Sequence, residues 1–77
     1  MTQQELDKII QDSKHNNTRI TINNETLLGL SMQEANMQEA DMREADMRGT
    51  NMQKANMRGA NMQEANMQWA DMRGVNM

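Results

Sequence analysis

The methionines are the residues of this sequence with the most evident metal chemistry. Eleven of the 77 residues are methionine, and every fifth residue from Met32 to Met77 is one. Thioether sulfurs bind Cu(I), which makes a copper site the first possibility to weigh. The sequence has no cysteine and one histidine, His15, to complete such a site. Methionine is also a flexible, polarizable filler of hydrophobic cores, and we interpret the row as core.

Asparagine or aspartate precedes each of these methionines from Asn36 to Asn76, and such a column could form a carboxylate ladder for Ca²⁺. The acids of this column, Asp41, Asp46 and Asp71, are interleaved with asparagine. Asparagine and aspartate side chains often bond the nearby backbone and stabilise turns. We therefore predict no metal site and no cofactor.

Catalytic side chains form no recognised set. Acid–base catalysis needs paired carboxylates in a cleft, whereas we expect the glutamates of the repeat to lie outward in solvent. His15 lies in a polar stretch, and no Ser-His-Asp or Cys-His arrangement is visible. We predict that the protein is not an enzyme and has no catalytic residues.

Charge and hydropathy exclude further classes. Eight Lys and Arg stand against 11 Asp and Glu, a net charge of -3, which argues against general nucleic-acid binding. The apolar runs are far too short to span a membrane. The first five residues lack the basic and apolar regions of a secretory signal, so the expected location is the cytoplasm.

The five-residue period decides which elements carry these side chains. In an α-helix five residues turn the chain by about 500°, so successive methionines would visit every side of the helix. In a continuous strand an odd period sends them to opposite faces. A chain that turns a corner every five residues points each methionine, and the small residue two before it, inward. This is a β-solenoid; a helical stretch is the main alternative, because Ala, Met, Gln, Glu and Arg favour helices.

The unit reads Ala-(Asn/Asp)-Met-polar-variable, as in residues 40–44 and 55–59. It resembles the pentapeptide-repeat proteins, whose consensus is Ala-(Asp/Asn)-Leu-x-x, with methionine here in the place of leucine. The resemblance implies a right-handed, four-sided β-helix with four units per coil, in which residues twenty apart stack. We therefore predict an all-β fold, a right-handed quadrilateral β-helix of about three coils over 20–77. Met42 should then lie between Ile22 and Met62.

The first nineteen residues differ from the repeat and are predicted to form a separate unit, 1–19. Thr2-Gln3-Gln4-Glu5 has the spacing of a capping box, and Leu6, Ile9 and Ile10 share one side of a helix. The spacing predicts a short helix over about 3–12, followed by a polar connector, 13–17. This helix should cover the first coil, because a solenoid end exposes core and strand edges.

Val75 and Met77 would be inward residues on an uncovered coil. Two interpretations are open: the chain is a fragment, or this end meets another copy. End-to-end dimers through the C-terminal coil are known in the family that the repeat resembles. The resemblance therefore implies a homodimer through this end. From the charge and the short apolar runs we expect no direct nucleic-acid partner and no membrane.

Trp69 is the only aromatic residue, and in the four-sided register it stacks above Gly49 and Gly29. Leu28 and Arg48 belong to the neighbouring column. Tryptophan and arginine are common at interfaces, so the predicted interaction surface is Leu28, Arg48, Trp69, Val75 and Met77. The alternative is that Trp69 folds over the glycines and shields the backbone.

The sequence favours a non-enzymatic interaction or structural module that self-associates. The alternative function is modulation of a type II topoisomerase, gyrase, by DNA mimicry, because some relatives of the resembled family act in that way. From Leu30 to Met77 the chain has 7 acids and 5 bases, so its charge is nearly balanced. This balance makes mimicry the weaker hypothesis.

Overall fold

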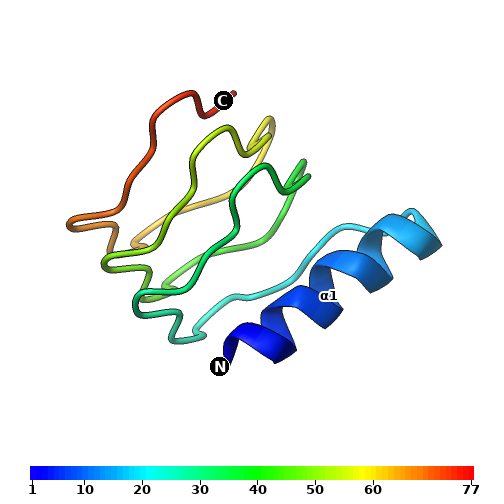
Figure 1. Ribbon diagram of the computed structural model, residues 1–77, viewed down its shortest axis with the longest axis horizontal. Helices are drawn as coiled ribbons and strands as arrows, with labels where there is room; N and C mark the ends of the chain where they lie inside the picture. The colour runs from blue at the N-terminus through cyan, green and yellow to red at the C-terminus, as the bar shows by residue number, and fades with distance from the viewer.

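The computed structural model describes all residues, 1–77, and contains one α-helix followed by a stack of coils (Figure 1). The helix α1 spans Gln3–Asn16. We number the coils by their residues: the first coil is 20–39, the second coil is 40–59 and the last coil is 60–77. Figure 1 shows α1 lying against the first coil, at the opposite end of the stack from the C-terminus.

Parallel β-bridges join residues twenty apart, which gives each coil four sides. They connect the residue before each methionine position to its equivalent in the next coil: Thr21↔Asp41↔Asn61, Thr26↔Asp46↔Asn66, Ser31↔Asn51↔Asp71 and Asn36↔Asn56↔Asn76. The backbone bonds follow the same register, since the N–H groups of Ile22 and Met42 donate to Asp41 and Asn61 at 2.8 Å each. The predicted stacking of Met42 between Ile22 and Met62 is therefore confirmed.

Each β contact is one residue long, and no extended sheet forms. The predicted all-β class therefore holds for the parallel register but overstates the strand content. The reason lies in the corners: the fifth residue of every unit has a positive φ, between 59° and 73° from Asn24 to Gly74. This left-handed residue ends the extended stretch, and the next N–H closes the turn, as Ala45 does by donating to the Met42 carbonyl at 3.2 Å.

The asparagine and aspartate column stabilises these corners. From Asn36 to Asp71 every member accepts a hydrogen bond from the backbone N–H two residues later, at 3.1–3.4 Å. These bonds satisfy a backbone donor that the turn leaves free. The structural interpretation of this column is confirmed.

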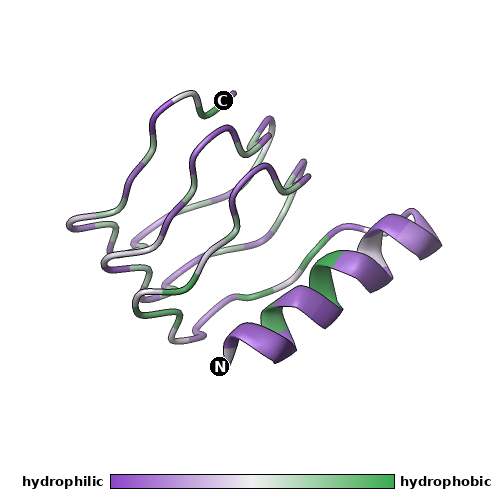
Figure 2. Ribbon diagram, viewed as in Figure 1, coloured by the Kyte–Doolittle hydropathy of each residue, from purple (hydrophilic) through white to green (hydrophobic).

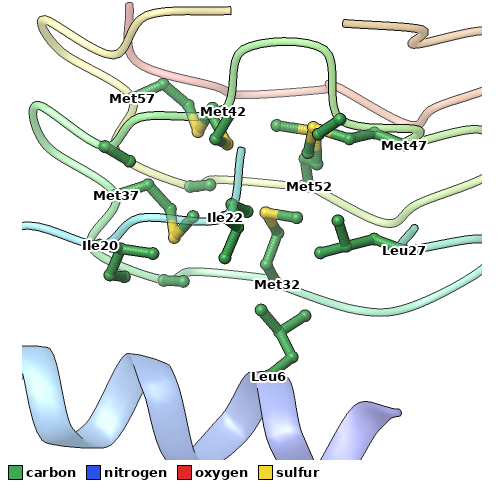
Figure 3. Close-up of a cluster of buried hydrophobic side chains, with 14 residues drawn as sticks. Leu6, Ile20, Ile22, Leu27, Met32, Met37, Met42, Met47, Met52 and Met57 are labelled. Atoms are coloured by element: carbon green, nitrogen blue, oxygen red, sulfur yellow. The ribbon is translucent and has the colours of Figure 1, made fainter. Parts of the chain in front are cut away.

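The core is a stack of side chains inside the coils, and Figure 3 shows those of the first two coils pointing inward. Its hydrophobic cluster contains 14 buried residues, among them the methionines from Met32 to Met57. Thr50 takes an alanine position and is buried, but its hydroxyl donates to the Met47 carbonyl at 2.9 Å. The polar group is therefore satisfied within the core.

The helix begins as the sequence predicts and ends later. The Thr2 hydroxyl accepts from the Glu5 N–H at 3.2 Å, and the Glu5 carboxylate accepts from the Thr2 N–H at 2.8 Å, which completes the capping box. The prediction of a connector over 13–17 is wrong for 13–16, which are helical. The helix stops at Asn17, whose left-handed φ of 55° lets its N–H bond to the Ser13 carbonyl.

The apolar side of α1 lies toward the first coil (Figure 2). Leu6 is fully buried, and Ile9 and Ile10 pack against the core with part of their surface exposed. Figure 3 shows Leu6 pointing from α1 toward Met32. No helix of this chain combines the length and the apolar character that crossing a bilayer requires.

Candidate interaction site at the last coil

The outer edge of the first coil is bonded on two of its four sides, at Thr26 and Ser31. The amide of Gln3, on α1, accepts from the Ser31 N–H at 2.7 Å and donates to the Ser31 carbonyl at 2.8 Å. This is the pair of bonds that a neighbouring coil would supply. The Met1 ammonium donates to the Thr26 carbonyl at 3.1 Å, so α1 and its first residues serve two sides of this edge.

The last coil exposes the residues that the other coils bury. The methionines from Met32 to Met57 are at most 2% exposed, whereas Met62, Met67 and Met72 are half-buried and Met77 is 67% exposed. The small inward residues follow the same trend, since Ala60, Ala65, Ala70 and Val75 are half-buried. The end of the stack is therefore an apolar face.

The backbone of the last coil is unpaired on the same face. In the second coil the methionine N–H donates to the last coil, as Met47 does to Asn66 at 2.8 Å, and the Ala45 carbonyl accepts from the Asn66 N–H at 2.9 Å. The equivalent N–H groups of Met62, Met67 and Met72 have no partner. The carbonyls of Ala60, Ala65 and Ala70 have none either. Three sides thus offer a donor and an acceptor beside an apolar centre.

The predicted interaction residues do not all meet at this face. Trp69, Val75 and Met77 belong to the last coil. Arg48 lies one coil away and Leu28 two coils away, on the same side as Trp69. The Arg48 guanidinium pairs with Asp46 at 2.7 Å rather than with Trp69. The register is as predicted, because Gly29 and Gly49 donate to the carbonyls of Arg48 and Gln68.

Residues 23–49 and 40–77 match the family model of pentapeptide repeats, in eight copies. The chain belongs to the pentapeptide-repeat family. The resemblance carried by the Ala-(Asn/Asp)-Met units is thereby confirmed, with methionine as this chain's central residue. No curated protein matches the chain.

Trp69 occupies a corner position of the pentapeptide repeat, with a φ of 60°, and is 81% exposed. Other corner side chains lie over the glycine of the following coil: a Cβ built on Gly59 would meet Glu39 Cγ at 3.3 Å, and one on Gly74 would meet Lys54 Cγ at 3.2 Å. A Trp69 side chain with the same direction extends beyond the last coil and does not lie over Gly49. The ring therefore stands beside the open face, and its exposure is not that of a shield over the glycines.

The sequence interpretation missed three ion pairs, one for each aspartate of the repeat. Each Asp-Met-Arg unit places the arginine two residues after the carboxylate: Asp41–Arg43 at 2.8 Å, Asp46–Arg48 at 2.7 Å and Asp71–Arg73 at 2.7 Å. The pairs are bidentate, since Nε bonds the other carboxylate oxygen. The signal was present, because arginine follows all three Asp-Met pairs.

These arginines change the acid–base behaviour of their partners. Hydrogen bonds from Arg43 lower the pKa of Asp41 to about 2. Hydrogen bonds from Arg48 lower the pKa of Asp46, and those from Arg73 and Gln53 lower the pKa of Asp71. The carboxylates are thus held ionised and charge-compensated at neutral pH, rather than poised to exchange protons.

Two other features of the surface bear on small-molecule chemistry, its acidic side chains and a cleft beside α1. The structure holds no group of three or more His, Asp or Glu side chains that could bind a metal ion. A cleft of about 360 Å³ between the end of α1 and the first coil is lined by Lys14, Arg19, Glu34 and Glu39, so its charges are balanced. The candidate functional site is the last coil, where apolar surface and unpaired backbone groups coincide.

Proposed function

We propose that this pentapeptide-repeat protein is a non-enzymatic interaction module that binds a second copy of itself through the last coil. Membership of the family supports a repeat module of this kind. The right-handed β-helix typical of the family is the frame that we infer for the coils. The proposed assembly is an end-to-end homodimer.

The observation that carries the proposal is the coincidence of apolar surface and unpaired backbone on one face. Met62, Met67 and Met72 each combine a half-buried side chain with a free N–H. Burying the side chains removes apolar area from water, and pairing the N–H groups removes unsatisfied donors. The last coil of a second copy can cover the side chains and pair the N–H groups, because each of its sides presents a donor and an acceptor.

The docking of α1 on the first coil favours a dimer over a filament. A head-to-tail stack would need the outer edge of the first coil, where Gln3 already bonds Ser31 on both its N–H and its carbonyl. Two last coils can instead meet around a two-fold axis, and such a contact closes on itself. Trp69, standing beside the open face, would lie next to the partner's coil.

The alternative function, gyrase modulation by DNA mimicry, is less well supported. A DNA mimic needs a field of uncompensated negative charge along its surface. Here Asp41, Asp46 and Asp71 are each compensated by an arginine. A gyrase supercoiling assay that is inhibited by the purified protein would favour this alternative.

Light scattering behind size exclusion, over a concentration series, tests the proposed function. We expect the mass to rise from one chain to two. Met67→Glu places a charge on the open face and should keep the protein at one chain. Gln68→Glu is the matched control, because it adds the same charge one residue away on the outward surface, and it should still form dimers.

Circular dichroism of each variant shows whether the fold is retained, so a loss of pairing is not confused with unfolding. A wild-type mass of one chain at every concentration would overturn the proposal. A folded Met67→Glu protein that still forms dimers would overturn the assignment to the last coil.

A further inference from the structure

The open face carries reactive atoms as well as apolar surface, namely the thioether sulfurs of its methionines. We propose that Met62, Met67, Met72 and Met77 are a modification site for peroxides, and that their oxidation to sulfoxides releases the second copy. The modification site is inferred from the exposure of these methionine side chains alone. The release of the second copy rests on the proposed self-association.

The selectivity of the oxidation follows from the difference in exposed fraction between methionines of the same stacked column. Met57 and Met77 occupy the same column, yet they are 1% and 67% exposed. Met42, Met47 and Met52 are 0% exposed, while the methionines stacked on them in the last coil are half-buried. A peroxide must reach the sulfur to react, so one residue type in one repeat divides into a protected set and an accessible set.

The reaction is a two-electron oxygen transfer. The sulfur lone pair attacks one peroxide oxygen, the O–O bond breaks, and a new S–O bond forms. The sulfur is oxidised to the sulfoxide, and the other peroxide oxygen is reduced and leaves as water after taking up the proton released by the first. The oxidation requires no other reactant.

The product is poorly suited to a buried apolar contact. A sulfoxide oxygen is a polar acceptor, and covering it without a donor is costly. Each sulfoxide on the face should raise the dissociation constant of the dimer by about tenfold. Pairing in turn covers the sulfurs, so oxidation should proceed through the free chain and slow as the protein concentration rises.

Trypsin separates the two sets of methionines, which makes the site directly measurable. Cleavage after Lys and Arg places Met62, Met67 and Met72 in peptide 59–73 and Met77 in peptide 74–77. The buried methionines fall in peptides 20–43, 44–48, 49–54 and 55–58, and Met1 falls in 1–8. After limited exposure of the folded protein to hydrogen peroxide, mass spectrometry counts the oxygens that each peptide has gained. Tandem spectra distinguish oxygen on methionine from oxygen on Trp69.

We expect peptides 59–73 and 74–77 to be oxidised at least tenfold faster than those of the buried set, and the dimer to dissociate as they are oxidised. A variant with Met62, Met67, Met72 and Met77 all changed to Leu should keep its dimer in peroxide. The matched control changes Met37, Met42, Met47 and Met52 to Leu, and its dimer should respond to peroxide as the wild type does.

Equal oxidation rates across the peptides of the folded protein would overturn the modification site. Selective oxidation with an unchanged dissociation constant would overturn the release of the second copy. If the untreated protein is a single chain at every concentration, the proposed self-association fails instead, and the peptide map still decides whether the last coil is the oxidation site.

Discussion

The backbone strain of this repeat is concentrated at its corner residues. Every unit needs a left-handed residue in its fifth position, yet several of these residues have side chains, including Glu34, Lys54 and Trp69. A left-handed residue with a side chain costs roughly 1–2 kcal/mol relative to a right-handed one, and glycine avoids that cost. Trp69 is thus both strained and exposed, and neither property helps the chain to fold.

Changing Trp69 to Gly should therefore raise the free energy of unfolding by about 1 kcal/mol. Trp69→Ala is the control, because it removes the ring but keeps the strained side-chain conformation, and it should show no such gain. Denaturant unfolding followed by circular dichroism measures both, in the Met67→Glu background so that pairing does not contribute. Equal stability of the two variants would show that the corner is not strained.

The Asp-Met-Arg ion pairs make stability depend on acid pH. An aspartate has an ordinary pKa of about 3.9, and Arg43 lowers the pKa of Asp41 to about 2 in the folded chain. Because the folded pKa is the lower one, the contribution to stability is complete above pH 4 and is lost as the pH falls through about 2. The lowered pKa values of Asp46 and Asp71 act in the same direction.

We expect the free energy of unfolding to fall on acidification through this range, and Asp41→Asn to flatten part of that fall. Asparagine keeps the turn hydrogen bond, as Asn36 does, and loses only the ion pair. Glu64→Gln is the comparison, since Glu64 forms no ion pair. A pH series of denaturant melts gives both curves, and an Asp41→Asn curve parallel to that of the wild type would contradict the account.

The helix α1 acts as the closing element of the first coil. Its contribution rests on Leu6, which is fully buried against the core. Leu6→Ala should cost about 2–5 kcal/mol of unfolding free energy, as large-to-small core substitutions do. Leu28→Ala is a matched control, since Leu28 is 50% exposed, and its effect should stay within about 0.5 kcal/mol. Similar losses in the two variants, measured by denaturant unfolding, would mean that α1 does not seal the core.

The sequence predicts the coils better than it predicts their ends. The five-residue spacing of methionine predicts a corner in every unit, and the register of Met42 on Ile22 followed from the four units per coil that the family resemblance implies. The end of α1 was less predictable, since it depends on Asn17 taking a left-handed conformation. The bonds from Gln3 to Ser31 join residues 28 apart and follow from how the helix docks, which local patterns do not encode.

The sequence predicted only part of the candidate site, because the rest depends on how side chains pack between coils. Val75 and Met77 were recognisable as inward residues of an uncovered coil. The direction of Trp69 was not, because it depends on how corner side chains pack over the next coil. The pairing of Arg48 with Asp46 could have been read from the Asp-Met-Arg pattern, had the residue after methionine not been treated simply as polar.

At the scale of the whole molecule, the two ends of the stack are unlike. One end has its core covered by Leu6 and one side of its outer edge bonded by Gln3, and the other has half-buried methionines and free backbone groups. A solenoid with one closed end can pair through its open end without growing into a fibre. We expect the open end to pair with a second copy in this way.

Amide hydrogen exchange, followed residue by residue by NMR at low and high protein concentration, detects this pairing at the backbone groups themselves. The N–H groups of Met62, Met67 and Met72 have no partner within one chain, so they should exchange freely at low concentration and become protected at high concentration. Ser31, already bonded to Gln3, should exchange at the same rate in both. Exchange at Met62, Met67 and Met72 that does not change with concentration would contradict pairing through the last coil.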